Sequence, residues 1–387
     1  MEKKIKVLQV IPKLGYGGAE TGCYDLAHYL PEKKCKSFII TSGGPLLKFI
    51  NKKKVKVFRL PVQSKNPIVM VFNFLAILLI IVLFNINIVH ARSRAPAWSC
   101  LMATKITRKK FVTTFHGTYN FKNKIKKFYN SVMVRSNLVI AGSNFIFSHI
   151  NENYGNFFLK KKRKLLVIFR GINTNYFYYK RVLPAKADKF AKEHNIDRNK
   201  FIILLPGRLT NWKGQIIFIE AIKSLLENKN IPSFETIILG SDQGRNVYKK
   251  KLVGLVQQYR LNKIVKFIDH CQEMPIAYSI SNLVVSSSIE PEAFGRVSVE
   301  AQSMEVPIVA SNIGGSKETI IDGKTGFLFK SGNPQDLADT IKIAMEKDYN
   351  SLKSIGIEGR KNILKKFDVD KMCYTTFTEY KKLIQSS

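Results

Sequence analysis

The amino-acid sequence predicts two doubly wound α/β domains. The chain has 387 residues, which is too long for a typical single domain and comfortable for two. In both halves, short apolar runs alternate with segments of helical pattern, as expected for βαβ units around parallel sheets. A Lys-rich, weakly patterned stretch from about Tyr176 to Asn199 separates the halves and is typical of a linker. We therefore expect one domain over residues 1–180 and a second over residues 181–367.

Buried strands are expected at compact apolar runs, because the strands of a parallel sheet are covered on both faces. In the first half these runs are Ile5–Ile11, Phe38–Thr41, Val55–Leu60, Ile86–Val89, Phe111–Phe115, Leu138–Ala141 and Leu165–Ile168. In the second half they are Phe201–Leu205, Glu235–Gly240, Ile264–Phe267 and Leu283–Val285. The segment Arg296–Met304 is expected to form a helix, and Ser143 is expected to cap another.

The segment Pro67–Val89 contains no charged residue and has two interpretations. By length, its apolar part Ile68–Phe84 could span a bilayer, but a span would pull the first strands away from the rest of their sheet. We favour the alternative, a crossover helix with one face on the sheet and the other face exposed. An exposed apolar face of this size marks contact with a partner or a membrane.

The composition indicates a folded protein with an anionic partner. Hydrophobic residues make up 45% of the chain, which excludes global disorder, and 63 Lys+Arg against 28 Asp+Glu give a formal charge of +35. This excess suits membrane lipid, a nucleotide, an acidic glycan or nucleic acid, or it is spread over a solvated surface. The basic stretch Lys122–Lys127, on an expected amphipathic helix, suits a membrane surface or is a solvated helix face.

The expected compartment is the cytoplasm. The five cysteines include no C-x-x-C pair, which suits a reducing environment and indicates no metal cluster. The apolar run near the N-terminus ends at Pro12 and is too short for the core of a signal peptide.

Several polar residues follow predicted strands, at the sheet edge where doubly wound folds bind ligands. Glycines in the loop Gly15–Gly18 would let the backbone approach a phosphate, although the loop lacks the third glycine of the dinucleotide fingerprint. His116 ends another strand. Arg208 and Lys213 combine a guanidinium with an ammonium, which suits a diphosphate. A tight βα turn, a structural histidine and two surface cations are the alternative interpretations.

The most informative stretch is Ser287–Phe329. A short strand ends at three serines, a loop carrying Glu290 and Glu292 follows, and a helix begins after Gly295 with Glu300 one turn in. Such a unit places backbone N–H groups and a helix N-terminus at a loop tip, where an anion can bind. Carboxylates beside an anion site suit the vicinal hydroxyls of a sugar, whereas the simpler alternative is a solvated acidic loop.

This stretch resembles the E-x7-E motif of the retaining GT-B glycosyltransferases of family GT4. Glu292 and Glu300 enclose seven residues in E-A-F-G-R-V-S-V-E. Four further pieces follow in the family's order, namely Ala301–Met304, Val306–Ala310, Gly314-Gly315-x-x-Glu318 and Asp322–Phe327. The resemblance extends more thinly over nearly the whole chain. It implies two Rossmann-like domains facing across a cleft, with a C-terminal helix in residues 368–387 packed back on the first domain.

The resemblance also implies roles for individual residues. Gly17 and Gly18 would lie beneath the donor sugar and its diphosphate. Arg208 and Lys213 would contact the pyrophosphate, and Glu300 would bind the nucleotide ribose.

Four more residues receive implied roles. Glu292 would lie near the hydroxyls of the donor sugar, within a nucleotide-sugar motif that includes Phe294 and Gly295. His116 would orient the donor sugar, so that His116 and Glu292 are the expected catalytic residues. Because Glu290 offers a second carboxylate two residues earlier, the first glutamate of the motif is assigned by spacing alone.

The implied reaction moves a sugar from a nucleotide diphosphate, expected to be UDP-linked, to an acceptor with retention of configuration. We expect no metal or other cofactor, because the only D-x-D sequence, Asp368-Val369-Asp370, lies far from the motifs. Arg296 inside the motif resembles enzymes of bacterial surface-polysaccharide and lipopolysaccharide assembly. We therefore expect a glycolipid or polysaccharide acceptor and peripheral attachment to the anionic inner face of the cytoplasmic membrane.

Other functions of the same architecture stay open. One is a non-catalytic nucleotide- or carbohydrate-binding protein, and another is a sugar-nucleotide epimerase, for which no acid/base set is visible. Nucleic-acid binding would explain the charge directly. It is not expected, because helix-turn-helix signals and basic motifs interleaved with aromatic residues are missing.

Overall fold

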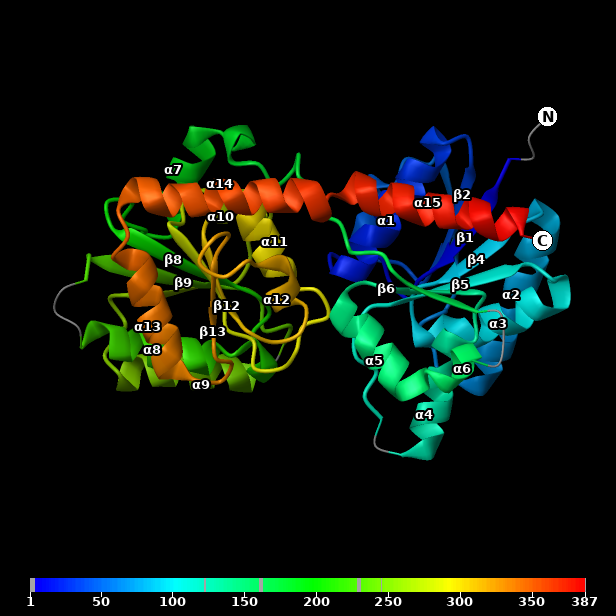
Figure 1. Ribbon diagram of the computed structural model, residues 1–387, viewed down its shortest axis with the longest axis horizontal. Coiled ribbons are helices and arrows are strands. Elements are labelled where there is room, and N and C mark those ends of the chain that lie inside the picture. The colour runs from blue at the N-terminus through cyan, green and yellow to red at the C-terminus, as the bar shows by residue number, and fades with distance from the viewer. Residues whose placement is uncertain (1–3, 122, 160–162, 228–230, 245, 387) are drawn as a thin grey trace. The chain divides into compact units, whose positions relative to one another are not determined.

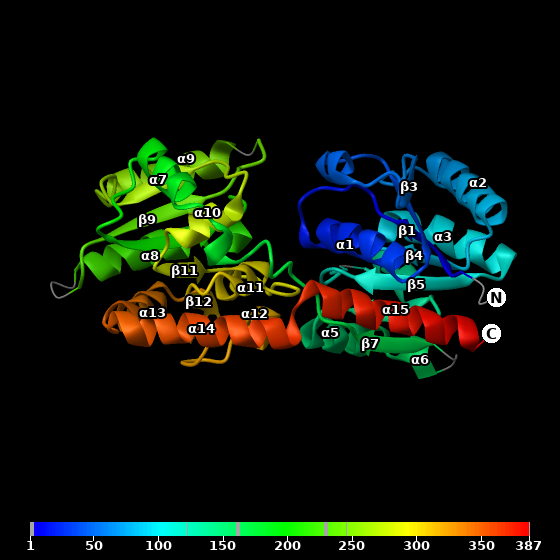
Figure 2. The same ribbon diagram turned by 90° about the horizontal axis from the view of Figure 1, so that it is seen from above.

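The computed structural model describes residues 4–121, 123–159, 163–227, 231–244 and 246–386, and it divides the chain into two compact units (Figure 1). Unit 1 comprises Met1–Gly171 and Val369–Ser387, and unit 2 comprises Ile172–Asp368. Each unit has a parallel sheet with helices on both faces, as Figures 1 and 2 show. The predicted fold class, two doubly wound α/β domains, is confirmed.

Unit 1 is built on a seven-stranded parallel sheet of order β3-β2-β1-β4-β5-β6-β7 over the described residues. Its strands are β1 (Lys6–Val10), β2 (Lys36–Thr41), β3 (Val55–Arg59), β4 (Ile88–Ala91), β5 (Lys110–Phe115), β6 (Leu138–Ala141) and β7 (Lys164–Val167). Its helices are α1 (Gly18–Glu32), α2 (Pro67–Phe84), α3 (Arg94–Thr107), α4 (Lys124–Asn130), α5 (Asn144–Tyr154), α6 (Asn156–Leu159) and α15 (Val369–Gln385), with 3-10 turns at Pro45–Phe49 and Ser131–Val134. The Ser143 hydroxyl accepts from the Ile146 amide, so the predicted cap of α5 is confirmed.

Unit 2 is built on a six-stranded parallel sheet of order β10-β9-β8-β11-β12-β13 over the described residues. Its strands are β8 (Phe201–Pro206), β9 (Phe234–Leu239), β10 (Val265–Ile268), β11 (Leu283–Ser286), β12 (Ile308–Ser311) and β13 (Phe327–Phe329). Its helices are α7 (Pro184–Glu193), α8 (Gln215–Leu226), α9 (Asn246–Gln258), α10 (Met274–Ser279), α11 (Arg296–Ser303), α12 (Ser316–Thr319), α13 (Pro334–Met345) and α14 (Tyr349–Lys366), with 3-10 turns at Tyr179–Arg181 and Asn211–Lys213.

Both sheets reverse their strand order once, and this topology fixes where ligands can bind. In unit 1 the reversal lies between β1 and β4, and in unit 2 it lies between β8 and β11. At such a switch point the loops leave the sheet in opposite directions and open a crevice at the carboxyl ends of the strands. The loops after β8 and β11 carry Arg208, Lys213 and Glu292, so the predicted donor residues lie at the switch point of unit 2.

The boundary between the domains differs from the expected one, because unit 1 ends at Gly171 rather than at residue 180. The reason is Phe177, whose side chain is buried in unit 2 with its ring 6.1 Å from the ring of Tyr278. The Phe177 carbonyl also accepts hydrogen bonds from the Ser303 hydroxyl and the Arg360 guanidinium, at 2.7 and 3.1 Å. These contacts attach the segment after Gly171 to unit 2.

The stretch interpreted as a linker contains a helix that the sequence analysis missed. Helix α7 starts with Pro184 at its first position, where a proline loses no helical hydrogen bond. Ala187, Phe190 and Ala191 form its buried face, with the spacing of an amphipathic helix. The many lysines on the opposite face concealed this pattern.

Helix α15 belongs to unit 1, although it follows unit 2 in the sequence. It packs on α1, and Cys373 and Tyr380 join a buried cluster that includes Val7 and Leu26. The Tyr380 hydroxyl lies 2.5 Å from Nδ1 of His90, which itself lies on β4. The C-terminal helix therefore completes the core of unit 1.

Helix α2 is the crossover helix between β3 and β4, and it packs beside α3 (Figures 1 and 2). Its buried residues are Asn73, Ile77, Ile80 and Ile81. Its outward residues are apolar and exposed: Ile68, Val71, Phe72, Leu75, Leu79, Val82 and Leu83. Among the described residues, α2 is the one helix whose length and hydropathy would suffice to cross a membrane. In this domain it instead leaves one apolar face uncovered.

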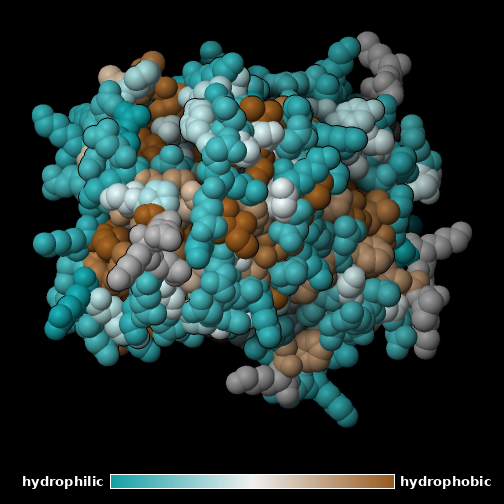
Figure 3. Space-filling view, turned by 60° about the vertical axis from the view of Figure 1, so that its left-hand side comes forward, coloured by the Kyte–Doolittle hydropathy of each residue, from teal (hydrophilic) through white to brown (hydrophobic). Residues whose placement is uncertain are grey.

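Hydrophilic and hydrophobic side chains share the surface (Figure 3). On the face drawn in Figure 3, hydrophilic side chains predominate, with hydrophobic ones in separate groups between them. In the predicted basic helix, α4, Ile125 and Phe128 are exposed beside lysines. Lys122, which the sequence analysis assigned to the same basic stretch, lies outside the described residues.

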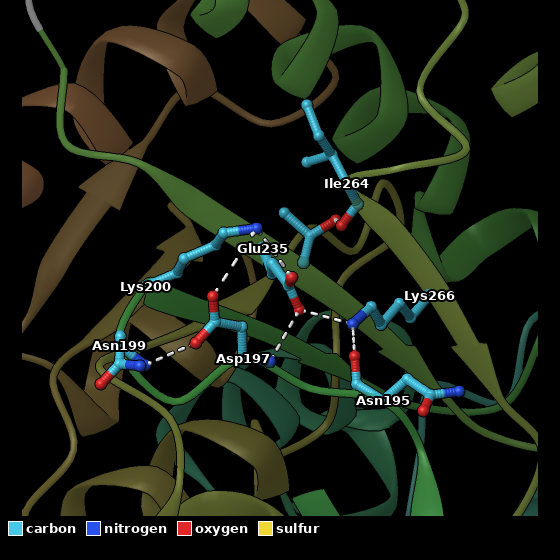
Figure 4. Close-up of polar contacts among 8 residues, drawn as sticks. Asn195, Asp197, Asn199, Lys200, Glu235, Ile264 and Lys266 are labelled. Carbon is cyan, nitrogen blue, oxygen red and sulfur yellow. Dashed lines mark hydrogen bonds and ion pairs between the residues drawn. The ribbon is translucent and has the colours of Figure 1, made fainter. Parts of the chain in front are cut away.

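A buried carboxylate anchors the start of β9 (Figure 4). Glu235 is 4% exposed and forms ion pairs with Lys266 at 2.6 Å and with Lys200 at 3.1 Å. It also accepts from the Asp197 amide, and Lys266 donates to the carbonyl of Asn195. Burial raises the pKa of Glu235, but the hydrogen bonds from both lysines outweigh it and leave the pKa below its usual value.

We expect Glu235→Gln to lower the free energy of unfolding of unit 2 by about 1–3 kcal/mol at pH 7, because it removes charge-assisted hydrogen bonds from a buried group. The pKa of this carboxyl is lower in the folded state than in the unfolded state, so the ionised group stabilises the fold at any pH above its unfolded-state pKa. This stabilisation is lost as the pH falls through the folded-state pKa. Urea unfolding should therefore show the difference from wild type shrinking below about pH 4.

The control is Glu193→Gln, which removes an exposed pair with Lys189 and should change the stability by less than about 0.5 kcal/mol. Equal losses of unfolding free energy in the two variants, or a loss that does not depend on pH, would show that ionised Glu235 does not stabilise the fold through its two lysines.

Candidate active site

The loop after β8 holds two cations above an aromatic ring. The Arg208 guanidinium carbon lies 5.9 Å from the centroid of the Trp212 ring, and the Lys213 Nζ atom lies 4.5 Å from it. Arg208 is exposed, and no carboxylate in the described part of the chain forms an ion pair with it. Its guanidinium is therefore available to an anionic ligand.

Gly214 sets the position of this loop against the loop after β11. Its φ of 71° is in the left-handed region, and a Cβ atom there would lie 1.9 Å from the carbonyl oxygen of Ser287. The Ser287 hydroxyl in turn donates to the carbonyls of Lys213 and Gly214, at 3.1 and 3.0 Å. The two loops thus contact each other backbone to backbone, and a glycine is required at the contact.

Lys213 and Glu292 form a largely buried ion pair at this junction. Their Nζ and Oε1 atoms are 2.7 Å apart, and the side chains are 13% and 10% exposed. The Ser288 hydroxyl donates to the same Oε1 atom at 2.6 Å. Burial raises the pKa of Glu292, but Lys213 and Ser288 outweigh it and leave the pKa lowered, so the carboxylate stays ionised at neutral pH.

The backbone around Glu292 is held by the glycines that follow β12. The Gly315 amide donates to the Glu292 carbonyl at 2.7 Å. Phe294 has its ring buried against Phe367, with the centroids 5.6 Å apart, so Phe294 can offer a ligand only its backbone. Gly295 caps α11 with a φ of 78°, a left-handed turn that aims the helix N-terminus along the loop.

Glu300 lies one turn into α11 and uses both carboxylate oxygens. Oε1 accepts from Arg296 at 2.5 Å, and Oε2 accepts from the buried Tyr278 hydroxyl at 2.8 Å. The carboxylate is therefore fixed in place. Each of its oxygens has a second lone pair for a ligand hydroxyl.

In unit 1, the predicted glycine loop begins α1. Gly17 is the N-cap residue, and its carbonyl accepts from the amides of Glu20 and Thr21 at 3.1 and 2.9 Å. A Cβ atom on Gly17 would lie 2.4 Å from a carboxylate oxygen of Glu20, so this position has no room for a side chain unless Glu20 moves. Gly17 and Gly18 thus present bare backbone at the carboxyl end of β1.

His116 follows β5 and contacts an arginine. Nδ1 lies 2.6 Å from Nη2 of Arg170, which also donates to the His116 carbonyl at 3.1 Å. Since a guanidinium can only donate, Nδ1 is the acceptor and the proton of the neutral ring is on Nε2. Burial and the Arg170 charge lower the pKa of His116 well below its usual value. Nε2 is buried and has no hydrogen-bond partner among the described residues.

The structure brings together Arg208, Lys213, Glu292 and Glu300 in unit 2, and places Gly17, Gly18 and His116 at the carboxyl edge of the sheet in unit 1. Of the two glutamates between which spacing could not choose, Glu292 forms the ion pair with Lys213, whereas Glu290 is exposed. Three partners of these residues were not predicted from the sequence: Ser288, Tyr278 and Arg170. Only Ser288 had a local signal, as one of three serines at the end of a strand.

The described residues include no group of three or more His, Cys, Asp or Glu side chains arranged to hold a metal ion. In the D-x-D sequence, Asp368 accepts from the Thr174 hydroxyl at 2.5 Å, and α15 starts at the next residue. Asp368 thus has a structural partner at the start of a helix.

Two family models match the chain. Glycosyltransferase Family 4 covers residues 16–176, and Glycosyl transferases group 1 covers residues 186–362. The crystal structure of a glycosyltransferase from Rickettsia africae ESF-5 has 35% sequence identity and a TM-score of 0.89, over 100% of both chains. The chain belongs to the family 4 glycosyltransferases, which have the GT-B fold.

Other family 4 glycosyltransferases and GT-B structures are similar at lower identity. The capsular polysaccharide biosynthesis glycosyltransferase CapM of Staphylococcus aureus is 27% identical over 209 residues, which are 54% of this chain and 53% of CapM. This chain thus spans about half the length of that curated relative. A crystal structure of Anabaena Alr3699/HepE in complex with UDP and glucose is 23% identical, with a TM-score of 0.82 over 98% of this chain and 100% of that chain. At this identity the likeness shows the fold.

The contact between the two loops can be tested with a pair of glycine variants. Gly214 and Gly323 have φ of 71° and 70°, but a Cβ atom on Gly323 meets nothing within 4 Å. Gly323→Ala should therefore cost only the left-handed backbone penalty of about 1–2 kcal/mol. Gly214→Ala should lower the free energy of unfolding by more than this, because the Ser287 carbonyl must also move. The movement should also disturb the ion pair between Lys213 and Glu292.

The measurement is the free energy of unfolding of both variants. Equal destabilisation would show that the loops do not constrain each other at Gly214.

Proposed function

We propose that this protein is a retaining glycosyltransferase that moves a sugar from a UDP-linked donor to a lipid-linked or lipopolysaccharide-type acceptor. The observation that carries the proposal is the largely buried Lys213–Glu292 ion pair beside the exposed Arg208. This arrangement supplies a fixed carboxylate for sugar hydroxyls and positive charge for a diphosphate within one pair of loops.

The cations would stabilise the leaving group. Negative charge grows on the diphosphate as the glycosidic bond breaks, and preorganised positive charge at that position lowers the barrier. Arg208 can bind two phosphate oxygens at once, whereas Lys213 is a point charge held by Glu292. The Anabaena structures with UDP and with UDP-glucose support a uridine nucleotide as the donor. We propose that the reaction requires no metal ion or other cofactor.

The two glutamates would recognise the hydroxyls at either end of the donor. Lys213 and Ser288 both contact Oε1 of Glu292. Neither side chain contacts Oε2 in the described part of the chain. Oε2 can therefore accept a hydrogen bond from the donor sugar. Glu300 would accept from the nucleotide ribose while Arg296 and Tyr278 hold it. Both carboxylates act as fixed acceptors in this scheme, and neither exchanges a proton.

His116 would orient the donor sugar rather than act as a base. Its neutral ring accepts from Arg170 at Nδ1 and presents Nε2–H as a hydrogen-bond donor. A general base would need an unprotonated nitrogen that faces the acceptor hydroxyl. The unprotonated nitrogen of His116 is Nδ1, which already accepts a hydrogen bond from Arg170.

The surface of unit 1 supports a proposal for the acceptor and the site of action. The uncovered apolar face of α2 and the exposed Ile125 and Phe128 of α4 lie in a chain with a formal charge of +35. We propose that this domain binds peripherally to the anionic inner face of the cytoplasmic membrane, where it meets a glycolipid or polysaccharide acceptor. The similarity to CapM supports a role in assembly of a surface polysaccharide.

We expect UDP at 100 times its dissociation constant to stabilise unit 2 by about 2.7 kcal/mol, seen as a rise in melting temperature that EDTA does not change. Arg208→Gln should remove most of this rise without changing the melting temperature of the free protein, because Arg208 is exposed. Lys251→Gln, an exposed lysine of α9, is the matched control. Full stabilisation of Arg208→Gln by UDP, or a rise that requires a metal ion, would contradict the proposal.

We expect His116→Ala to lower kcat/KM for UDP-glucose hydrolysis by roughly 10- to 100-fold, because a hydrogen bond to the donor sugar is lost. His116→Gln should retain more activity, since its amide can still donate. Because the pKa of His116 is far below its usual value, the pH profile between pH 6 and 8 should have the same shape in wild type and His116→Gln. A limb near pH 6.5 that only the wild type shows would indicate a general base.

We expect wild-type protein to float with vesicles that contain phosphatidylglycerol, and Phe72→Ser with Leu75→Ser to weaken this binding at least tenfold, because both side chains are half exposed on α2. The matched control is Ile343→Ser, which removes an equally exposed side chain from α13. Wild-type protein that stays soluble with these vesicles at low salt would rule out the membrane contact.

A further inference from the structure

Unit 1 contains a second candidate site that the donor chemistry does not use. It is a cavity of about 690 Å³ lined by residues of three segments: the approach to α2, the start of α3, and the loop and helix after β5. Its charged lining residues are Lys65, Arg94 and Lys126. The lining contains no acidic residue, and no carboxylate in the described ranges pairs with any of the three cations.

The position of the cavity is that of a ligand site. Arg94 begins α3 directly after β4, and Tyr119 lies in the loop directly after β5. Both strands end at the carboxyl edge of the sheet, and β4 is one of the two strands at the switch point. A crevice here receives ligands in doubly wound folds.

Arg94 is held in a fixed orientation. Its Nη1 donates to the buried Asn130 side chain at 2.8 Å, and its guanidinium lies 4.3 Å from the centroid of the Tyr119 ring. Asn130 in turn donates to the Tyr119 carbonyl at 3.0 Å. The Tyr129 hydroxyl, on another lining residue, is buried without a hydrogen-bond partner in the described part of the chain. A preorganised guanidinium and an unused hydroxyl suit phosphate oxygens.

Apolar surface adjoins the cationic lining. Ile125 lines the cavity and is 80% exposed, and Phe128 on the same helix is also exposed. Lys65 immediately precedes the cap of α2, whose first outward residues, Ile68 and Phe72, are apolar and exposed. A ligand with a phosphate and a hydrocarbon chain would satisfy both surfaces at once.

We propose that this cavity binds the phosphate-bearing headgroup of a lipid acceptor, a phosphate or diphosphate ester of a long-chain lipid. The proposal rests on the proposed function, because it names the class of acceptor that the transferase would use. The cations hold the phosphate, the amide and hydroxyl side chains of the lining hold the headgroup, and the hydrocarbon chain extends along the apolar face of α2.

The test is calorimetric titration of the full-length protein with dihexanoyl phosphatidic acid below its micelle concentration. We expect binding at least tenfold tighter than that of dihexanoyl phosphatidylcholine or inorganic phosphate. Arg94→Gln and the surface variant Lys126→Gln should each weaken it, Arg94→Gln by at least tenfold. Lys105→Gln, an exposed lysine of α3, should bind as wild type does.

Stabilisation by UDP serves as the check on folding and on the donor domain, and it should be unchanged in all three variants. Unchanged phosphatidic acid binding in both Arg94→Gln and Lys126→Gln overturns the proposal. Equal binding of inorganic phosphate or phosphatidylcholine overturns the choice of a lipid phosphate. Loss of the UDP effect in wild type, with phosphatidic acid still bound, would instead contradict the transferase function.

Discussion

The ion pair between Lys213 and Glu292 is the interaction on which the proposed donor site depends. Burying two charges costs several kcal/mol for each ion, and the attraction between them offsets this only with good geometry and further hydrogen bonds. The chain provides these through the Ser288 hydroxyl and through the close contact of the two loops at Gly214. The result is a carboxylate that stays ionised and immobile, next to an arginine that remains available.

The two domains place their basic residues in different ways. Unit 2 neutralises its central lysine with a glutamate, whereas unit 1 leaves Arg94, Lys65 and Lys126 around a cavity that has no acidic residue. With 63 basic and 28 acidic side chains, many cations in this chain must lack an acidic partner. At some positions this excess is a solvated surface. At the carboxyl edges of the sheets we propose that it serves to bind phosphate groups.

Much of the fold and part of the site could be predicted from the sequence, because both follow local patterns. Apolar runs predicted the strands of both described sheets except β12 and β13, and the spacing from Glu292 to Glu300 placed one glutamate in a loop and the other on a helix. Partners distant in sequence could not be predicted, since Tyr278 and Arg170 reach Glu300 and His116 only through tertiary packing. The domain boundary was misplaced for the same reason, because the burial of Phe177 in unit 2 has no local signal.

The most direct test of the central claim is a double-mutant cycle on Lys213→Met and Glu292→Gln, measured as the free energy of unfolding of unit 2. If the pair is a coupled, buried unit, the double variant should be less destabilised than the sum of the single variants by about 1–3 kcal/mol, since neither change then leaves an isolated charge. Additive effects, within about 0.5 kcal/mol, would show that the two residues act independently and would contradict the claim that Lys213 and Glu292 form one coupled unit.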